Sequence, residues 1–265
     1  MAEHTYQTIL FEMRNKGAWI TMNLPKDMNS LTVDMLSEIE NVLNACRDDE
    51  NVAAVAVTGS GRAFCTGANL KEILSSLHDP TPGTKDFLER IGEVFNMIRA
   101  YPKPVIAAVN GYSLAGGLEL VMSCDLVIAA ESAKMGDAHA NFGILPGAGG
   151  AAVLPRKAGI NRAKYLMFTG DSVSASEMER YGLVNKVVPD GELTASVDEL
   201  IQKLSEKSPL VLRKMKELAN DSLNQTQASA LHQELLYLRH HNRSYDLNEG
   251  LEAFGEKRRP EFKGY

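Results

Sequence analysis

Apolar and polar positions alternate in two stretches near the N-terminus, residues 6–12 and 17–24. The turn-forming residues Asn15, Lys16 and Gly17 lie between these stretches. Alternation on both sides of such a turn is typical of two antiparallel strands, each with one buried face. The pattern therefore predicts a β-hairpin at the start of the chain.

From Val33 onward the apolar residues recur at helical spacing, which predicts a helix with Thr32 as its N-cap. The run AAVAVTG at 53–59 is short, continuous and apolar, so it predicts a strand covered on both faces. A second such run extends from Val105 to Val109 and ends at an Asn-Gly turn. The order of strands and helices predicts an α/β fold.

The apolar segment that follows Gly111 is predicted to be a helix, and Gly116 and Gly117 mark its beginning. Glycine lets a ligand's carbonyl oxygen approach bare N–H groups, and the first four N–H groups of a helix lack partners within the helix. Glu119 lies in the same first turn and supplies a carboxylate able to transfer protons. We therefore expect donors for a developing oxyanion, and a base that creates it, to lie together.

Residues 75–86 contain two prolines and a glycine among polar residues and predict a loop, either a lid or an ordinary solvated connection. The segment 183–189 predicts a last strand, after which the pattern becomes helical. The apolar helix faces expected there comprise Leu193, Val197, Leu200, Ile201 and Leu204; Leu210, Leu212, Met215 and Leu218; and Leu231, Leu235, Leu238 and Tyr245. A small helical appendage is therefore expected after a completed core.

The 265 residues are compatible with one large domain, or with one domain and a small appendage. The sequence has 28 Lys and Arg against 34 Asp and Glu, for a net charge of −6. No global basic field for nucleic acid exists, so a polyanionic ligand must be held by local positive charge.

Cys46, Cys65 and Cys124 are odd in number and form no CxxC pair, so we expect neither a disulfide framework nor a metal site. The N-terminus lacks an apolar core of signal-peptide length, and apolar runs of about 18 residues are absent from the sequence. We expect a cytoplasmic protein with neither a membrane nor a nucleic acid as its partner.

Several segments of the sequence resemble those of the enoyl-CoA hydratase and isomerase (crotonase) superfamily, in its order and spacing. They are LPKDMNSL at 24–31, AFCTGANLKEI at 63–73, GYSLAGGLEL at 111–120, CDLVIA at 124–129, GILPGAGG at 143–150 and EGLEAFGEKRRPEFKG at 249–264. The resemblance extends over nearly the whole chain. It implies a ββα spiral core at 1–195, carrying the active site, and a helical C-terminal trimerisation region at 196–265.

This resemblance implies an enzyme acting on an acyl-CoA thioester. In the family, two backbone N–H groups stabilise the thioester oxygen, and the matching residues here are Ala68 and Gly116. Glu119 matches a catalytic glutamate that acts on water in the family's hydratases. We therefore expect an enoyl-CoA hydratase-like activity, adding or eliminating water at an α,β-unsaturated thioester.

The second glutamate of the family's hydratases is absent, because His139 stands at its position, two residues after Asp137. An imidazole with an ordinary pKa of about 6.5 can deliver a proton to Cα or orient a water molecule, and Asp137 can hold its tautomer. The alternative is a histidine that only shapes the pocket. Gly147 occupies the position of an aspartate used by some relatives in dienoyl isomerisation or dehalogenation, which disfavours those reactions.

The resemblance also implies a binding site for the CoA moiety. On this basis CoA would contact Lys26, Met28, Ala63, Leu70 and the two oxyanion-hole residues, Ala68 and Gly116. It would also contact Phe254 and Lys257 from the C-terminal tail of the same or of a neighbouring subunit. CoA would enter as part of the substrate, without a separate cofactor, and the assembly would be a homotrimer or a homohexamer.

Other reactions of the fold remain open at this stage: double-bond isomerisation, C–C hydrolysis and C–C lysis. A second class of function is a CoA-binding homologue without catalytic activity. The presence of Glu119 and of both oxyanion segments argues against such a loss of chemistry.

Overall fold

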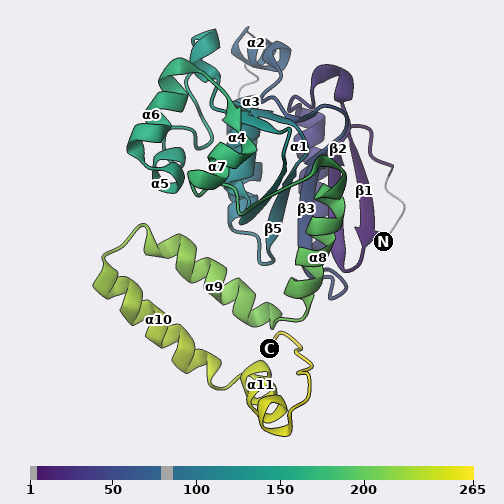
Figure 1. Ribbon diagram of the computed structural model, residues 1–265, viewed down its shortest axis with the longest axis vertical. Coiled ribbons are helices and arrows are strands. Elements are labelled where there is room, and N and C mark those ends of the chain that lie inside the picture. The colour runs from purple at the N-terminus through teal and green to yellow at the C-terminus, as the bar shows by residue number, and fades with distance from the viewer. Residues whose placement is uncertain (1–4, 79–85) are drawn as a thin grey trace.

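Two sheets and the helices that connect them form the core, for which a computed structural model describes residues 5–78 and 86–265 (Figure 1). Among these residues the larger sheet has six strands in the order β1-β2-β3-β5-β7-β10, and the smaller has four in the order β4-β6-β8-β9. Successive passes of the chain add a strand to the large sheet, a strand to the small sheet and then helical structure. This arrangement confirms the expected α/β spiral.

Short strands alternate with helices along most of the chain. The strands are β1 (Ile9–Arg14), β2 (Gly17–Met22), β3 (Ala54–Gly59), β4 (Ala63–Cys65), β5 (Val105–Val109), β6 (Tyr112–Leu114), β7 (Leu126–Ala130), β8 (Lys134–Gly136), β9 (Val173–Ser174) and β10 (Lys186–Val188). The α-helices are α1 (Val33–Cys46), α2 (Leu70–His78), α3 (Phe87–Arg99), α4 (Gly116–Ser123), α5 (Leu154–Ala158), α6 (Ile160–Thr169), α7 (Ala175–Arg180), α8 (Leu193–Ser205), α9 (Pro209–Ser222), α10 (Gln227–His241) and α11 (Tyr245–Glu256). Short 3₁₀ helices span η1 (Pro25–Asp27), η2 (His139–Phe142) and η3 (Asp190–Glu192).

The N-terminal predictions are confirmed. Strands β1 and β2 pair antiparallel, with Arg14 opposite Gly17. Asn15 and Lys16 both have positive φ, as a two-residue turn between right-twisted strands requires. The Thr32 side chain accepts a hydrogen bond from Met35 N and so caps α1.

The predicted strands 53–59 and 105–109 correspond to β3 and β5, and both are covered on two faces. Val55 and Val105 belong to a core cluster that includes residues of α1, α3 and α4, whereas Ala56 and Ile106 belong to a second cluster with residues of α8. Neighbouring parallel strands need long crossover connections, which here run through helices. The sheet is therefore enclosed as expected for a parallel arrangement.

Three local predictions were wrong: where the loop after α2 begins, where the helix after Gly111 begins, and which helix contains Tyr245. The helix α2 continues through residues 75–78 of the predicted loop, because the apolar spacing of Leu70, Ile73 and Leu74 outweighs the turn residues that follow. Asp86 is the N-cap of α3, and residues 79–85 lie outside the described residues. The segment after Gly111 begins as strand β6, and α4 starts only at Gly116.

The third error lies near the C-terminus. Tyr245 does not share a helix with Leu231, Leu235 and Leu238, because α10 ends at His241 and Ser244 caps a separate helix, α11. The Ser244 side chain accepts a hydrogen bond from Leu247 N.

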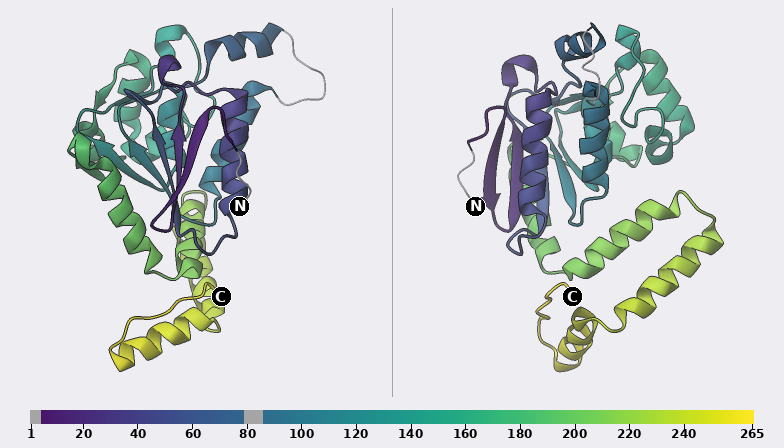
Figure 2. Two further views of the ribbon diagram at one scale, coloured as in Figure 1. Left: turned by 90° about the vertical axis from the view of Figure 1, so that its right-hand side faces the viewer. Right: turned by 180° about the vertical axis from the view of Figure 1, so that it is seen from behind.

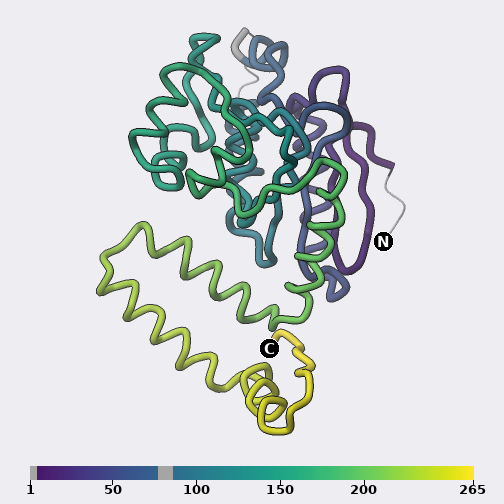
Figure 3. Tube along the Cα trace, viewed as in Figure 1, coloured from purple at the N-terminus to yellow at the C-terminus, as the bar shows by residue number. Residues whose placement is uncertain are grey.

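The C-terminal helices α9, α10 and α11 form an arm that extends below the two sheets (Figures 2 and 3). The preceding helix α8 packs on the large sheet, where Val197 and Ile201 are fully buried. The division predicted between residues 195 and 196 falls inside α8 and stays a prediction. In the part of the chain that the structure describes, none of the helices is both long and apolar enough to cross a bilayer.

Candidate active site

The start of α4 borders a cavity of about 410 Å³. The cavity lies between the segment that leads into α2, the helices α2 and α3, and the segment that follows β8. Its lining includes Ala68, Leu70, Gly116, Glu119, His139 and Ala148. All four predicted catalytic residues are thus brought together, although they come from three segments that are far apart in the sequence.

Ala68 and Gly116 lie against each other at one end of this cavity. A Cβ atom added to Gly116 would lie 3.2 Å from Gly67 Cα and 3.4 Å from Ala68 N. Leu31 N donates to Gly67 O, and Asn69 N donates to Leu31 O. These two hydrogen bonds use the residues on either side of Ala68 and do not involve Ala68 N. Within the described chain, neither Ala68 N nor Gly116 N donates a hydrogen bond to a carbonyl outside the regular elements. Two adjacent amides are therefore available to a ligand oxygen.

Close packing around the next glycine fixes the position of α4. All residues of α4 are buried. A Cβ atom added to Gly117 would lie 2.0 Å from Cys65 O, far inside van der Waals contact. Ala115, just before the helix, has a φ of 50° and donates its N–H to Gly136 O. The glycine pair thus lets α4 start directly against the segment that carries Ala68.

Glu119 lies in the first turn of α4, and only 3% of the residue is exposed. Its Oε1 atom accepts hydrogen bonds from Ala148 N and Gly150 N, each at 2.8 Å. Its Oε2 atom lies 3.8 Å from His139 Nε2. One carboxylate oxygen is therefore fixed by two amides, and the other lies on the side of the imidazole.

His139 begins η2 and is oriented by Asp137, whose Oδ1 lies 3.1 Å from His139 Nδ1. Burial by itself lowers the pKa of His139. The hydrogen bond and the charge of Asp137, together with the charge of Glu119, outweigh that effect and raise the pKa above its ordinary value. The arrangement favours an imidazolium whose Nε2 proton lies on the side of Glu119.

Asp137 is only 1% exposed, and its second oxygen, Oδ2, is buried without a hydrogen-bond partner among the described residues. A Cβ atom added to Gly150 would lie 2.5 Å from this oxygen. Burying a carboxylate is costly unless a cation compensates it, and the nearby cation here is protonated His139. Asp137 and His139 thus depend on each other's charge.

The predicted CoA contacts lie around the cavity in different ways. Leu70 lines it directly. Lys26 is exposed in η1 and Met28 follows η1, next to the lining residue Asp27. The carbonyl oxygen of Ala63 accepts a hydrogen bond of 2.7 Å from Asn29 Nδ2. A role of these residues in CoA binding stays a prediction.

Phe254 and Lys257 do not line the cavity of their own chain. Phe254 is 86% exposed on α11, and Lys257 forms the left-handed C-cap of that helix. Figure 1 places α11 at the end of the molecule opposite to α2. Contact between these residues and CoA requires another subunit, as the sequence analysis proposed, and stays a prediction.

Sequence reasoning missed two features of the site. The amides of Ala148 and Gly150 hold Glu119, and the available signal was the small-residue run GAGG at 147–150. Arg99, which donates to Ala148 O, gave no signal because the contact joins positions far apart in the sequence.

Comparisons with known proteins point to one family. A family model described as enoyl-CoA hydratase/isomerase matches residues 12–265. The crotonyl-CoA hydratase of Syntrophomonas wolfei subsp. wolfei is 39% identical over 260 residues, covering 97% of this chain and 98% of that protein. The short-chain-enoyl-CoA hydratase of Clostridium acetobutylicum is 36% identical over 254 residues, covering 96% of each.

Solved structures show the same fold. The crystal structure of an enoyl-CoA hydratase from Bacillus anthracis superposes with a TM-score of 0.89 at 36% sequence identity, covering 98% of this chain and 100% of that one. Both the sequence and the architecture are thus shared along nearly the entire length. The chain belongs to the enoyl-CoA hydratase/isomerase family, as an enoyl-CoA hydratase-like enzyme.

Proposed function

We propose that this protein adds water across an α,β-unsaturated acyl-CoA thioester and catalyses the reverse elimination. The observation that carries the proposal is the pair of available amides, Ala68 N and Gly116 N, in the cavity that the buried residue Glu119 also lines. Attack of water at Cβ places negative charge on the thioester oxygen, which paired N–H donors stabilise. Loss of one such donor typically raises the activation free energy by about 3–4 kcal/mol.

Glu119 is the general base in this scheme. Its Oε2 takes a proton from water while the water oxygen forms a bond to Cβ. The π electrons of the C=C bond then form a double bond between Cα and the thioester carbon, and the π electrons of the C=O bond move onto the thioester oxygen. Because Oε1 already accepts two backbone hydrogen bonds, the carboxylate is held in one orientation. A base that is already held in the reactive orientation lowers the activation free energy, because no orientational entropy is lost in reaching the transition state.

His139 is the general acid. As the enolate collapses, Cα takes the proton of His139 Nε2, which gives the 3-hydroxyacyl thioester. Glu119 has then gained one proton and His139 has lost one. A shift of roughly 1 Å brings Oε2 and Nε2, 3.8 Å apart, within hydrogen-bond distance for the transfer that restores the starting state. The scheme requires no separate cofactor, since CoA enters as part of the substrate.

The lining of the cavity supports an aliphatic acyl group. Leu70, Ile73, Leu88 and Ile91 contribute apolar side chains from α2 and α3. Burial of apolar surface favours hydrocarbon over charged acyl groups. We therefore propose a role in fatty acid metabolism. The cytoplasmic location expected from the sequence stays a prediction.

Hydration is tested with purified protein and crotonyl-CoA. Loss of the enoyl absorbance, with the 3-hydroxyacyl thioester identified by mass spectrometry, supports the proposal. A shifted double bond instead supports isomerisation. Cleavage of a β-diketone or a hydroxyacyl thioester, without turnover of any simple enoyl-CoA, supports a hydrolase or lyase. Calorimetric CoA binding without turnover across a broad acyl-CoA panel supports a non-catalytic homologue.

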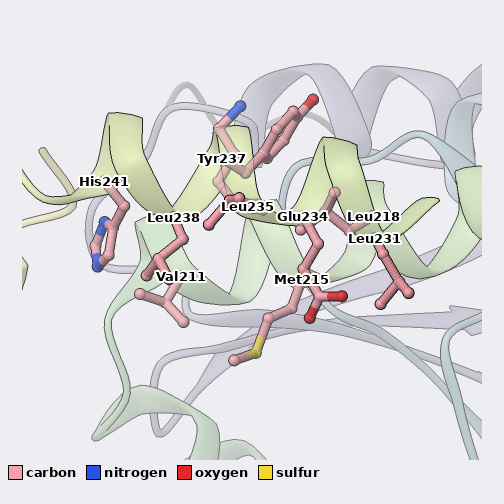
Figure 4. A pocket seen from close by; sticks show the side chains of 10 residues that line it. Val211, Met215, Leu218, Leu231, Glu234, Leu235, Tyr237, Leu238 and His241 are labelled. Atoms are coloured by element: carbon pink, nitrogen blue, oxygen red, sulfur yellow. The ribbon is translucent and has the colours of Figure 1, made fainter. Parts of the chain in front are cut away.

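We further propose that the arm mediates assembly into a homotrimer or a homohexamer. Apolar side chains of α9 and α10 surround a groove of about 400 Å³ (Figure 4). Leu231 is 58% exposed, Leu235 43% and Leu238 54%, and exposed apolar surface of this extent is typical of interfaces. Assembly would also bring Phe254 and Lys257 to the CoA of a neighbouring subunit.

Sedimentation equilibrium tests the assembly. We expect a trimer or hexamer for the native chain and a smaller species for Leu235→Glu, because a carboxylate in an apolar interface is costly. A monomeric native protein would contradict the proposed assembly without affecting the proposed reaction.

A further inference from the structure

The segment 147–150, whose amides hold Glu119, is itself held by a half-buried cation, the guanidinium of Arg99. We propose that Arg99 is a positioning residue that keeps the Ala148–Gly149 peptide in place, so that the amides of Ala148 and Gly150 converge on Glu119 Oε1. The inference rests on the proposed function only in that Glu119 is the base. It assigns a role to a side chain that does not itself line the cavity.

Arg99 is the last residue of α3, and its guanidinium binds the segment directly. Nη2 donates to Ala148 O at 2.5 Å, and Nη1 donates to Asn96 Oδ1 at 2.8 Å. The carbonyl that Arg99 binds belongs to the peptide between the two amides that donate to Glu119. One guanidinium contact therefore orients the peptide that joins both donors.

Gly149 makes this approach possible. Its φ is 140°, in a region that side-chain-bearing residues rarely adopt. A Cβ atom added there would lie 3.0 Å from Arg99 Nη2. The guanidinium thus packs against a backbone without a side chain, which explains a glycine at this position independently of Glu119.

The charges around Arg99 fit a role in stabilising the base. Burial lowers the pKa of Arg99, and the negative charge of Glu119 opposes that effect. Its Nε is buried without a hydrogen-bond partner among the described residues, and the guanidinium stays charged at all working pH values. Lys157 is a further cation near Arg99.

The opposite side of Glu119 faces two further charged groups of the site. His139 Nε2 lies near Oε2, and Asp137 lies behind the imidazole. Arg99 therefore influences Glu119 from the Oε1 side, through the segment 147–150. Asp137 and His139 influence it from the Oε2 side.

The end of α3 is in turn tied to the arm. Asn220 Nδ2 donates to Arg99 O at 3.2 Å, and Lys216 Nζ donates to Ile98 O at 3.1 Å. Both donors belong to α9. Two hydrogen bonds from α9 thus fix the end of α3 that carries the guanidinium, and a positioning residue requires such support.

The test compares Arg99→Met, Arg99→Lys and the control Arg90→Gln, which removes an arginine of the same helix that pairs with Glu40 and Glu93. In Arg99→Met we expect kcat for crotonyl-CoA to fall about 10- to 100-fold with KM nearly unchanged, because the base is misplaced and not the substrate. Arg99→Lys, which keeps a cationic donor, should recover most of the loss. Arg90→Gln should match the native enzyme.

A second measurement does not depend on turnover. Hydrogen exchange of the peptide covering residues 147–153 should become at least about tenfold faster in Arg99→Met and stay slow in the other two variants. Native-like exchange there, or a kcat within about twofold of native in Arg99→Met, would overturn the inference. If the native chain does not hydrate enoyl-CoA, the proposed function fails, and the exchange result still decides the role of Arg99.

Discussion

The two sides of the cavity are built from different parts of the polypeptide. On one side, Ala68 and Gly116 offer main-chain amides whose positions depend on glycine packing. On the other, Asp137 and His139 offer side chains whose charges depend on each other. Main-chain donors cannot be altered without moving the backbone, whereas side chains can be exchanged. The comparison suggests that the proposed oxyanion site is fixed and that the proposed proton donor is adaptable.

Glu119 lies between the two sides, and its loss should have the largest effect. Glu119→Gln keeps an oxygen for the amides of Ala148 and Gly150 but removes the base, so kcat for crotonyl-CoA should fall at least about 1,000-fold. Steady-state kinetics measure the loss, and calorimetry should show unchanged CoA binding. The exposed Glu131→Gln is the matched control. Substantial residual activity in Glu119→Gln would contradict a general base at this position.

The main-chain side is tested next by Gly117→Ala. The new Cβ would lie 2.0 Å from Cys65 O, so α4 must move away from the segment that carries Ala68. We expect a loss of about 100- to 1,000-fold in kcat, the usual cost of a misplaced oxyanion donor. Thermal unfolding should also show a lower Tm, because neither backbone can yield without loss of packing.

Gly92→Ala is the matched control for that substitution. Gly92 lies inside α3, and a Cβ atom there would have open space. Alanine in a helix interior is favoured over glycine by up to about 1 kcal/mol, so this variant should be slightly more stable and equally active. Equal behaviour of the two variants would show that close packing at Gly117 does not matter.

The side-chain side is tested by His139→Gln. Loss of a general acid should reduce kcat about 100-fold, less than loss of the base, because a water molecule can deliver the proton more slowly. His139→Glu, which introduces the residue that the resemblance implies at this position, should restore part of the rate. A histidine that only shapes the pocket would instead show a changed KM with kcat preserved.

The features that could be predicted from the sequence are those that depend on residues close together in the chain. Gly116, Gly117 and Glu119 lie within one turn of one helix, so their mutual placement follows from local geometry. The apolar runs of β3 and β5 predicted buried strands correctly, because burial on both faces leaves no polar position in the pattern.

The rest of the site depends on contacts that leave no local pattern. Ala138 has a φ of 56°, unusual for alanine, and this turn lets the His139 ring lie against Asp137. The contact of Arg99 with Ala148 joins two distant segments. The last turn of α2 was also missed. The prolines and the glycine in the sequence at 79–85 predict a break, but they do not show where the preceding helix ends.

Asp137→Asn should have the smallest effect on rate and the most specific effect on pH dependence. The pKa of His139 is raised, so an activity that needs the imidazolium is present below that pKa and is lost as pH rises through it. Asparagine can still accept a hydrogen bond from Nδ1 but lacks the charge. Burial, which lowers the pKa of His139, is then opposed by one charge fewer, so the pKa falls and the alkaline limb of kcat/KM should move to lower pH.

The pH profile of kcat/KM with crotonyl-CoA measures this shift, and Asp198→Asn is its control, because Asp198 accepts a hydrogen bond from Trp19 Nε1 away from the cavity. At acidic pH the Asp137→Asn enzyme should approach the native rate, since His139 is protonated in both. An alkaline limb that stays in place or moves upward would show that the charge of Asp137 does not control the proton on His139. The two sides of the cavity would then differ in construction but not in electrostatic role.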